Sequence, residues 1–148
     1  MIHRDDDLPA IECPNGDKWW YKNGVLHRDG DFPAVDCHDK KEWWKYGNRH
    51  RESDLPAIVN TTSKMWYTTG NIHRESDLPA IEYNNGDREW YKDNKLHRES
   101  GLPAVVYSDG TKMWYKKGFK HRRGGFAAVE WEDGDREWWD HGVMIKKN

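Results

Sequence analysis

Apolar and aromatic residues recur along the chain in short clusters, and polar or turn-forming residues separate each cluster from the next. One kind of cluster joins a hydrophobe to Pro-Ala and a β-branched residue, as in Leu78-Pro79-Ala80-Ile81. The other kind joins Trp to a second aromatic residue, as in Trp90-Tyr91. These clusters favour strands, because Pro and Gly interrupt the chain too often for a helix. Asn85-Gly86 between the two clusters therefore predicts a β-hairpin.

The pattern recurs six times with a nearly fixed period. The pair His-Arg stands at 3–4, 27–28, 50–51, 73–74, 97–98 and 121–122, so successive copies are 24, 23, 23, 24 and 24 residues apart. Such self-similarity marks an array of stacked units. We therefore predict an all-β fold, in which six hairpin repeats of 23–24 residues form one elongated antiparallel sheet or solenoid of about twelve strands. Residues 1–148 would form a single repeat domain with a C-terminal cap at 138–148 and copies beginning near His3, His27, His50, His73, His97 and His121.

Pairing across a two-residue turn assigns the residues of each hairpin to the two faces of the sheet. In the fifth copy it places Val105 opposite Trp114 and Val106 opposite Met113. Because side chains alternate between faces, the β-branched residue and the recurring Trp would share one face, which we expect to be the core. Ala and the second aromatic residue would occupy the opposite face. The second and third copies have one residue fewer between the β-branched residue and Trp, which predicts a deletion in their hairpin turns.

The composition indicates that this core is aromatic. The chain contains 10 Trp, and its 24 Lys+Arg nearly cancel its 26 Asp+Glu to give a net charge of −2. A buried Trp or Tyr removes roughly 150–250 Å² from water, so rows of them can replace aliphatic residues. The balanced charge argues against a general nucleic-acid binder. No apolar run approaches the ~18 residues of a membrane span, and a leaderless start with two cysteines indicates reduced thiols and a cytoplasmic location.

The stretch Trp20-Tyr21-Lys22-Asn23-Gly24-Val25-Leu26-His27 resembles the Trp-x-Asn-Gly-x-x-His core of MORN repeats, which are similar in period. The resemblance implies successive β-hairpins and an interaction scaffold for protein or lipid contacts rather than one chemistry. Two features depart from it, because His-Arg stands where MORN repeats have His-Gly, and Pro-Ala replaces a glycine-flanked strand. Both features are similar to MORN-variant arrays with a Leu-His-Arg…Pro-Ala signature, which implies a source in a tailed phage or a large DNA virus.

The repeated His residues and the cysteines do not favour a metal site or catalysis. Equivalent positions in adjacent hairpins lie about 9–10 Å apart, which is too far for ligands ~2.0–2.3 Å from one zinc ion. Cys13 and Cys37 share a repeat position, which places them beyond the ~7 Å limit for a disulfide. The singular Cys37-His38-Asp39 is too weak a pattern for a catalytic dyad. We expect no metal, cofactor or enzyme activity, and expect each His-Arg to pair with nearby carboxylates such as Asp5, Glu52, Glu75 and Glu99.

Three functions stay open at this point. The first is a non-enzymatic scaffold that binds a host-cell protein, for host takeover or anti-defence, through an aromatic stripe whose acidic rim suits a basic patch. Its candidate residues are Trp44, Tyr67, Tyr91, Tyr115, Trp139, Val59, Met65, Val106, Met113, Glu42, Glu82 and Glu89. The second is a binder of nucleic acid or a nucleotide-type anion, using Arg28, Arg51, Arg74, Arg98 and Arg122. The third is a structural or assembly component that self-associates through its sheet edges.

Overall fold

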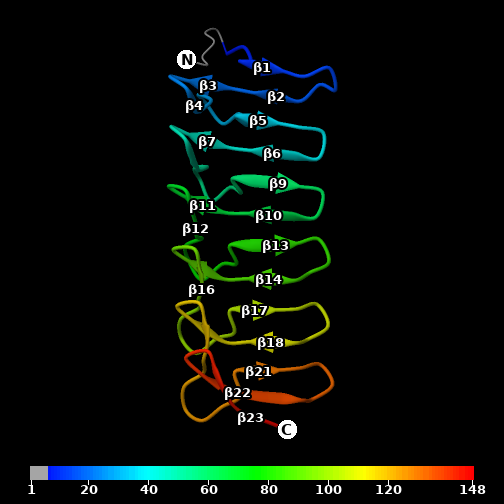
Figure 1. The fold of residues 1–148 in the computed structure, drawn as a ribbon, viewed down its shortest axis with the longest axis vertical. Helices are drawn as coiled ribbons and strands as arrows, with labels where there is room; N and C mark the ends of the chain where they lie inside the picture. Colours follow the sequence, from blue (N-terminus) through cyan, green and yellow to red (C-terminus); the bar gives the residue numbers. More distant parts are fainter. Residues whose placement is uncertain (1–6) are drawn as a thin grey trace. The chain divides into compact units, whose positions relative to one another are not determined.

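The computed structural model describes residues 7–148, which form short β-strands and no helix (Figure 1). This confirms the all-β class and the array of hairpin repeats. None of these residues belongs to a helix that is long and apolar enough to cross a membrane. The chain divides into two compact units, of which the first ends at Asn71 and the second begins at Ile72. The assignment of residues 1–148 to one repeat domain stays a prediction.

In the first unit the strands of the main sheet follow one another in chain order and are all antiparallel. They are β1 (Ile11–Glu12), β2 (Lys18–Trp19), β5 (Val35–Asp36), β6 (Lys40–Glu42), β9 (Ile58–Asn60) and β10 (Ser63–Met65). Three small hairpins stand beside this sheet: β3 (Tyr21–Lys22) with β4 (Val25–Leu26), β7 (Trp44–Lys45) with β8 (Asn48–Arg49), and β11 (Tyr67–Thr68) with β12 (Asn71–Ile72), the last of which reaches the start of the second unit.

The second unit repeats the same construction. Its main-sheet strands are β13 (Ile81–Tyr83), β14 (Arg88–Glu89), β17 (Val105–Val106), β18 (Lys112–Met113), β21 (Val129–Glu130), β22 (Arg136–Asp140) and β23 (Val143–Lys147). Its small hairpins are β15 (Tyr91–Lys92) with β16 (Lys95–Leu96), and β19 (Tyr115–Lys116) with β20 (Phe119–Lys120). In the sixth copy β22 runs on past Trp138 into the second turn and pairs with β23, with an irregularity between Trp138 and Trp139.

Each repeat therefore contains two hairpins rather than one, which corrects the expected strand number. Residues 7–148 contain 23 strands instead of about twelve. The second turn of each copy closes a small hairpin of its own, because its two central residues have positive φ angles, as at Tyr46 (48°) and Gly47 (79°). That is the type I′ geometry whose twist matches a two-residue hairpin. The chain thus alternates between a main hairpin and a side hairpin (Figure 1).

The register of the main hairpins differs by one residue from the one that the sequence predicted. Val105 lies opposite Met113 rather than Trp114, and Val106 lies opposite Lys112. The turn has three residues, because the Tyr107 N–H donates to the Thr111 carbonyl and Gly110 has a φ of 100°. Such a turn ends in a glycine bulge that adds one residue to the loop. A shift of one residue moves a side chain to the other face, so the predicted face assignment was wrong.

The second and third copies use a shorter turn, as their spacing predicted. Val35 pairs with Glu42, and the Cys37 N–H donates to the Lys40 carbonyl, which leaves a two-residue turn. The third copy is equivalent, with Ile58 opposite Met65. The deletion removes the bulge residue, so all copies place the β-branched residue opposite the residue that precedes Trp.

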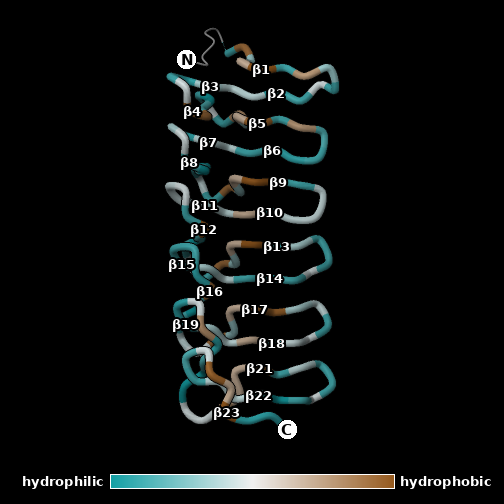
Figure 2. Tube along the Cα trace, in the orientation of Figure 1, coloured by the Kyte–Doolittle hydropathy of each residue, from teal (hydrophilic) through white to brown (hydrophobic). Residues whose placement is uncertain are grey.

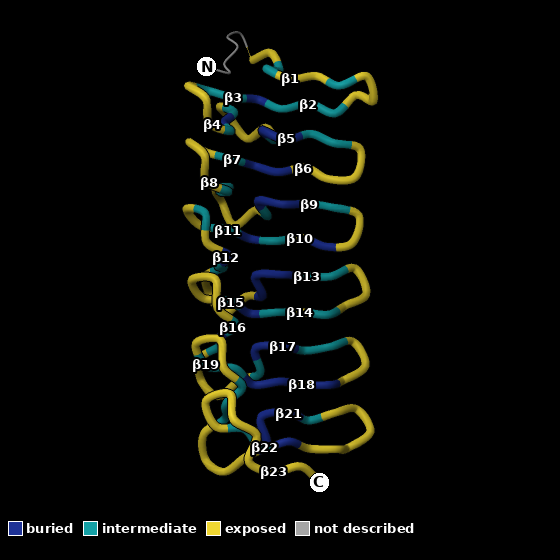
Figure 3. Tube along the Cα trace, in the orientation of Figure 1, coloured by how far each residue is buried: buried dark blue, intermediate teal, exposed yellow. Residues whose placement is uncertain are grey.

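Both faces of the hairpins contribute to the core. On one face Trp114 and Ala128 are buried, and the Ala128 carbonyl accepts the backbone N–H of Trp114 at 2.8 Å. On the other face Val105, Met113 and Val129 form a buried cluster. Figure 3 shows the buried residues along the main-hairpin strands and the exposed ones at the loops, and Figure 2 shows that many of the loops are hydrophilic. The recurring Trp residues are buried, as predicted, at Trp20, Trp43, Trp66, Trp90 and Trp114.

Replacing a buried Trp should destabilise the fold far more than replacing an exposed one. We expect Trp114→Ala to lower the free energy of unfolding by about 3–5 kcal/mol, because a large cavity remains. Trp131, which is 38% exposed, provides the control, and Trp131→Ala should cost less than about 1 kcal/mol. Urea titration followed by circular dichroism measures both. Equal losses in the two variants would show that the Trp114 indole is not the core element described above.

Candidate functional site

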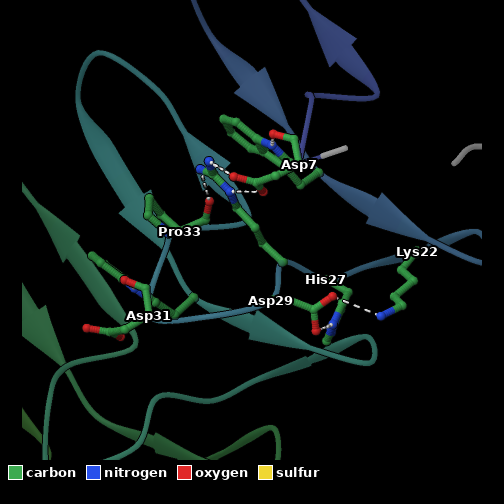
Figure 4. A network of polar contacts seen from close by, with 9 residues as sticks. Asp7, Lys22, His27, Asp29, Asp31 and Pro33 are labelled. Atoms are coloured by element: carbon green, nitrogen blue, oxygen red, sulfur yellow. Dashed lines mark hydrogen bonds and ion pairs between the residues drawn. The ribbon is translucent and has the colours of Figure 1, made fainter. Parts of the chain in front are cut away.

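Within each unit a guanidinium group joins one copy to the copy before it. The Arg28 Nε and Nη2 atoms donate to the two carboxylate oxygens of Asp7, each at 2.8 Å, and the guanidinium lies 3.8 Å above the Trp20 ring. Arg28 Nη1 also donates to the Pro33 carbonyl in its own copy. The Trp20 indole N–H donates in turn to the Asp7 backbone carbonyl at 3.0 Å. Figure 4 shows this network around Asp7 and Pro33. We call this Asp–Trp–Arg arrangement the inter-repeat clasp.

The clasp recurs with nearly constant geometry. Arg51 contacts both carboxylate oxygens of Asp31 and lies 3.7 Å above Trp43. In the second unit Arg98 does the same with Asp77, at 3.9 Å above Trp90. The bidentate geometry requires a planar guanidinium, which Lys cannot supply. These Arg side chains are structural elements of the repeat.

The clasp between the fifth and sixth copies lacks its carboxylate. Gly101 stands at the Asp position and keeps only the backbone part, since its carbonyl accepts the Trp114 indole N–H at 2.7 Å. Arg122 still lies 3.7 Å above Trp114, but it donates to Glu130 at 2.7 Å instead. A positive φ of 70° at Gly101 explains why glycine is tolerated where other copies place Asp.

The His residues beside these Arg residues bond to carboxylates, as the sequence predicted. His27, His50, His73 and His97 each place Nε2 within 3.0 Å of the acidic residue two positions later. The Nδ1 atom of His27 also accepts the backbone N–H of Tyr46 in the next copy, and the two rings stack at 4.3 Å. Lys22 shares the Asp29 carboxylate with His27 (Figure 4), and these contacts lower the pKa of Asp29 to about 2. The first pair, His3-Arg4, and Asp5 lie outside the described residues.

The Arg residues considered for anion binding therefore already form hydrogen bonds and ion pairs with carboxylates of the protein. Arg28, Arg51 and Arg98 are held in complete clasps, and Arg74 and Arg122 donate to Glu82 and Glu130. Their side chains are at most 22% exposed. An anion that approached them would have to displace a carboxylate.

A hollow repeats between successive copies next to each clasp. Its volume is ≈ 420 Å³ between His27 and Leu55, ≈ 400 Å³ between His73 and Ser100, and ≈ 260 Å³ between His97 and Arg123. The first two hollows contain equal numbers of cationic and acidic residues. The third contains Arg98, Lys116, Arg122 and Arg123 but only one acidic residue, Glu99.

The predicted aromatic stripe is half-buried and packs on the main hairpins. Tyr115 and Trp139 lie against the Val105–Met113–Val129 cluster. The Trp44 indole N–H donates to Glu42 at 2.8 Å, and the Tyr91 hydroxyl donates to Glu89 at 3.0 Å. Tyr67 is half-buried and lies 5.5 Å from the Arg49 guanidinium. Burial and the Glu89 charge raise the pKa of Tyr91.

The residues predicted to border the stripe differ in exposure. Met113 and Glu42 are buried, whereas the remaining ones are half-buried, namely Val59, Met65, Val106, Glu82 and Glu89. Burial alone would raise the pKa of Glu42, but its ion pairs with Lys40 and Arg49 hold the pKa below its ordinary value. That these residues form a protein interface stays a prediction.

A row of exposed apolar side chains was not identified from the sequence. The hydrophobe before each Pro-Ala or Ala-Ala is 40–63% exposed in every described copy. In the first unit these residues are Leu8, Phe32 and Leu55, and in the second they are Leu78, Leu102 and Phe126. We call this set the Leu/Phe row. Its recurrence before Pro was visible in the sequence, but its exposure was not, because the row lies in loops outside the strands. Four of its residues line the hollows, namely Phe32, Leu55, Leu78 and Leu102.

The cysteines are half-buried free thiols. Burial raises the pKa of the Cys37 thiol, which disfavours the thiolate form that nucleophilic catalysis needs. The neighbouring His38 backbone N–H donates to Asp17 at 3.0 Å. The Cys37-His38-Asp39 turn thus shows the features of a structural turn.

No known family model matches the chain, and no curated protein resembles it closely enough to be matched. The repeated antiparallel hairpins agree with the architecture that the MORN resemblance implies.

The Asp77 carboxylate should make stability depend on pH. Its contact with Arg98 holds the pKa of Asp77 below its ordinary value, so the clasp is fully formed above the unfolded pKa of ~3.9. That stabilisation is lost as the pH falls through the lowered folded-state value. Between pH 6 and pH 3 the wild type should therefore lose more unfolding free energy than Asp77→Asn. Urea titrations at each pH measure this, and the exposed turn variant Asp39→Asn should follow the wild type. Parallel profiles for the wild type and Asp77→Asn would contradict the clasp.

The packing of the aromatic stripe can be tested through Tyr115. We expect Tyr115→Ser to lower the free energy of unfolding by about 2 kcal/mol, somewhat less than the ~3–5 kcal/mol of a fully buried aromatic residue. Tyr46 is 62% exposed, so Tyr46→Ser should cost under about 1 kcal/mol. If Tyr115→Ser leaves stability unchanged in urea titrations, the stripe does not pack on the sheet.

Proposed function

We propose that this protein is a non-enzymatic interaction scaffold that binds a partner protein through the Leu/Phe row. The single observation that carries the proposal is the exposure of the same apolar position in every described copy, although the neighbouring Trp and Ala residues are buried. Isolated exposed hydrophobes need no explanation, but exposure of an apolar residue at the same position of every described copy supports a role outside the fold. Within each unit the row presents one apolar side chain per repeat.

The surroundings of the row support this proposal. Phe32 and Leu55 line the hollow of ≈ 420 Å³ together with charged residues of the clasps. Exposed apolar side chains therefore lie beside a hollow whose charges balance. Protein interfaces combine such an apolar centre with a polar rim. The Arg28 guanidinium lies 5.0 Å from the Phe32 ring and 3.8 Å from the Trp20 ring. The exposed Phe32 ring therefore packs next to a side chain that the clasp holds in place. A side chain ordered before binding loses little entropy when the partner arrives.

The finer parts of the proposal rest on resemblance. The Leu-His-Arg…Pro-Ala signature supports membership in the MORN-variant arrays and a viral source. On that basis the partner is a protein of the infected cell, and the outcome of binding is host takeover or inhibition of a defence system. The cytoplasm is then the place of encounter.

Binding of a nucleotide-type anion is the second candidate, and the hollow between the fifth and sixth copies favours it. Lys116 and Arg123 line this hollow, and neither forms an ion pair among residues 7–148. The two residues that neutralise the equivalent hollows are absent, because Gly101 replaces Asp and Arg123 replaces the acidic residue that follows the other His-Arg pairs. Uncompensated cations beside an aromatic residue suit a phosphate group attached to a base.

Removing the row in the second unit should abolish partner capture without unfolding the chain. We expect the triple variant Leu78→Ser, Leu102→Ser and Phe126→Ser to keep its circular dichroism spectrum and to lose the partner that the wild type retains from host lysate. Phe119 is 56% exposed at a side-hairpin tip, so Phe119→Ser should retain the partner as the matched control. Retention by the triple variant would contradict the proposal.

The same experiment separates the two candidate functions. Capture through the apolar row should change little between about 50 and 200 mM salt, whereas phosphate-driven binding should weaken steeply. Arg123→Ser should leave protein capture intact. If Arg123→Ser and salt both abolish capture, and the row variant does not, the anion-binding function is favoured instead.

A further inference from the structure

Three potential metal ligands meet in the sixth copy. Asp140 and His141 lie at the turn between β22 and β23, and His121 follows β20. One Asp140 oxygen lies 2.8 Å from His121 Nδ1 and 2.5 Å from His141 Nδ1. One ligand atom from each residue falls within 4.8 Å of the others, and this is the one such cluster of His, Cys, Asp and Glu in the part of the chain that the structure describes. The two imidazole rings lie 4.2 Å apart.

The cluster arises where the sixth copy departs from the repeat. In three earlier copies the Nδ1 atom of the His in the His-Arg pair accepts a backbone N–H from the next side-hairpin turn. His27 accepts from Tyr46, His50 from Thr69 and His97 from Lys117. His121 Nδ1 is buried and accepts no backbone N–H. In the sixth copy it faces a carboxylate instead, because an Asp140 oxygen lies 2.8 Å away, at ion-pair distance.

The residues that face His121 also differ from those of the other copies. The position of Asp140 is occupied by Lys22, Lys45, Thr68, Lys92 and Lys116 in the preceding copies. The position of His141 is occupied by Asn23, Tyr46, Thr69, Asp93 and Lys117. Only the sixth copy therefore replaces a cation with a carboxylate and adds a second imidazole. His73 Nδ1 is likewise unpartnered, but it belongs to no such cluster.

We propose that His121, Asp140 and His141 bind a divalent transition-metal ion of the zinc class. Two imidazole nitrogens and one carboxylate are the donors that zinc prefers, whereas magnesium and calcium favour oxygen ligands alone. The atoms are close enough that small side-chain rotations bring all three to zinc-ligand distance. Because Asp140 and His141 are 57% and 66% exposed, water fills the remaining coordination position. This proposal is independent of the Leu/Phe row.

The metal would link the hairpin of β22 and β23 to His121, which follows β20. Among the described residues no Arg guanidinium stacks on the Trp138 ring. Lys146 Nζ lies 4.7 Å from the centre of that ring instead. A Lys side chain cannot form the bidentate contact of the clasp. A metal bound by His121 after one side hairpin and by Asp140-His141 in the next joins the same two elements that the His27–Tyr46 contact joins in an earlier copy. It therefore takes the place of the backbone contact that His121 Nδ1 lacks.

Zinc titration of the whole chain tests the site. We expect Zn²⁺ to bind with micromolar affinity in isothermal titration calorimetry and to raise the melting temperature, and Co²⁺ to give the visible absorption of a nitrogen- and oxygen-ligated ion. Asp140→Asn keeps the shape of the side chain, and His141→Tyr restores the ring pair seen at His27 and Tyr46. Each variant should bind Zn²⁺ at least tenfold more weakly while its circular dichroism stays unchanged.

His73→Gln is the matched control, because it removes an equally enclosed His with an unpartnered Nδ1. This variant should bind Zn²⁺ as the wild type does. The proposal is overturned if the wild type does not bind Zn²⁺, or if Asp140→Asn and His141→Tyr bind it unchanged. It is also overturned if a Cys13→Ser, Cys37→Ser variant loses the binding, because the cysteines would then be the ligands.

Discussion

The stack of a guanidinium on an indole, fixed by an Asp of the same copy as that indole, is the interaction on which the repeat depends. Each strand of the main hairpins has only two to five residues, so backbone pairing alone provides few contacts per copy. The clasp adds a cation–π contact, a bidentate ion pair and an indole hydrogen bond at one point, as at Arg98, Asp77 and Trp90. Because Arg belongs to one copy and Asp and Trp to the preceding one, the clasp holds neighbouring copies together within a unit.

The clasp also explains which residues vary along the array. Its backbone part needs only a carbonyl in a tight turn, so Gly101 can replace Asp as long as Arg122 finds another carboxylate, which Glu130 supplies. Arg74 also donates to Glu82. Glu130, an acidic residue of a main hairpin, is thus the anchor of Arg122 in the one described contact where glycine stands in place of the clasp Asp. The sequence showed the variation but not its cause, because the two residues are eight positions apart and meet only through the loop.

The sequence predicted the period, the hairpins, the buried Trp residues and the His–carboxylate pairs, because each depends on local pattern. The prediction was wrong where the length of a turn, different by one residue, sets the register of the two strands. The glycine bulge at Gly110 shifts Val105 from Trp114 to Met113, and the aromatic Tyr115 thereby joins the core. A turn dipeptide such as Asp-Gly fits both a two-residue and a three-residue loop, so pattern alone could not choose. The Leu/Phe row was missed for another reason, because its residues lie in loops outside the strands, where the alternation of side chains between two faces does not apply.

The regularity of the array makes its exceptions informative. Residues that look functional in one copy, such as His27 and Arg28, are explained once the same contacts recur at His97 and Arg98. We therefore expect a function to use residues that the internal contacts of the repeat do not engage, or residues that differ in one copy. The Leu/Phe row is repeated yet exposed, so the internal contacts of the fold do not account for its apolar character. Asp140 and His141 differ from the residues of the preceding copies, and Asp140 faces His121, whose Nδ1 meets a carboxylate where His27 and His97 meet a backbone N–H. The exposed Leu/Phe row and the His121–Asp140–His141 cluster are therefore the two features on which the proposed partner surface and the proposed ion site rest.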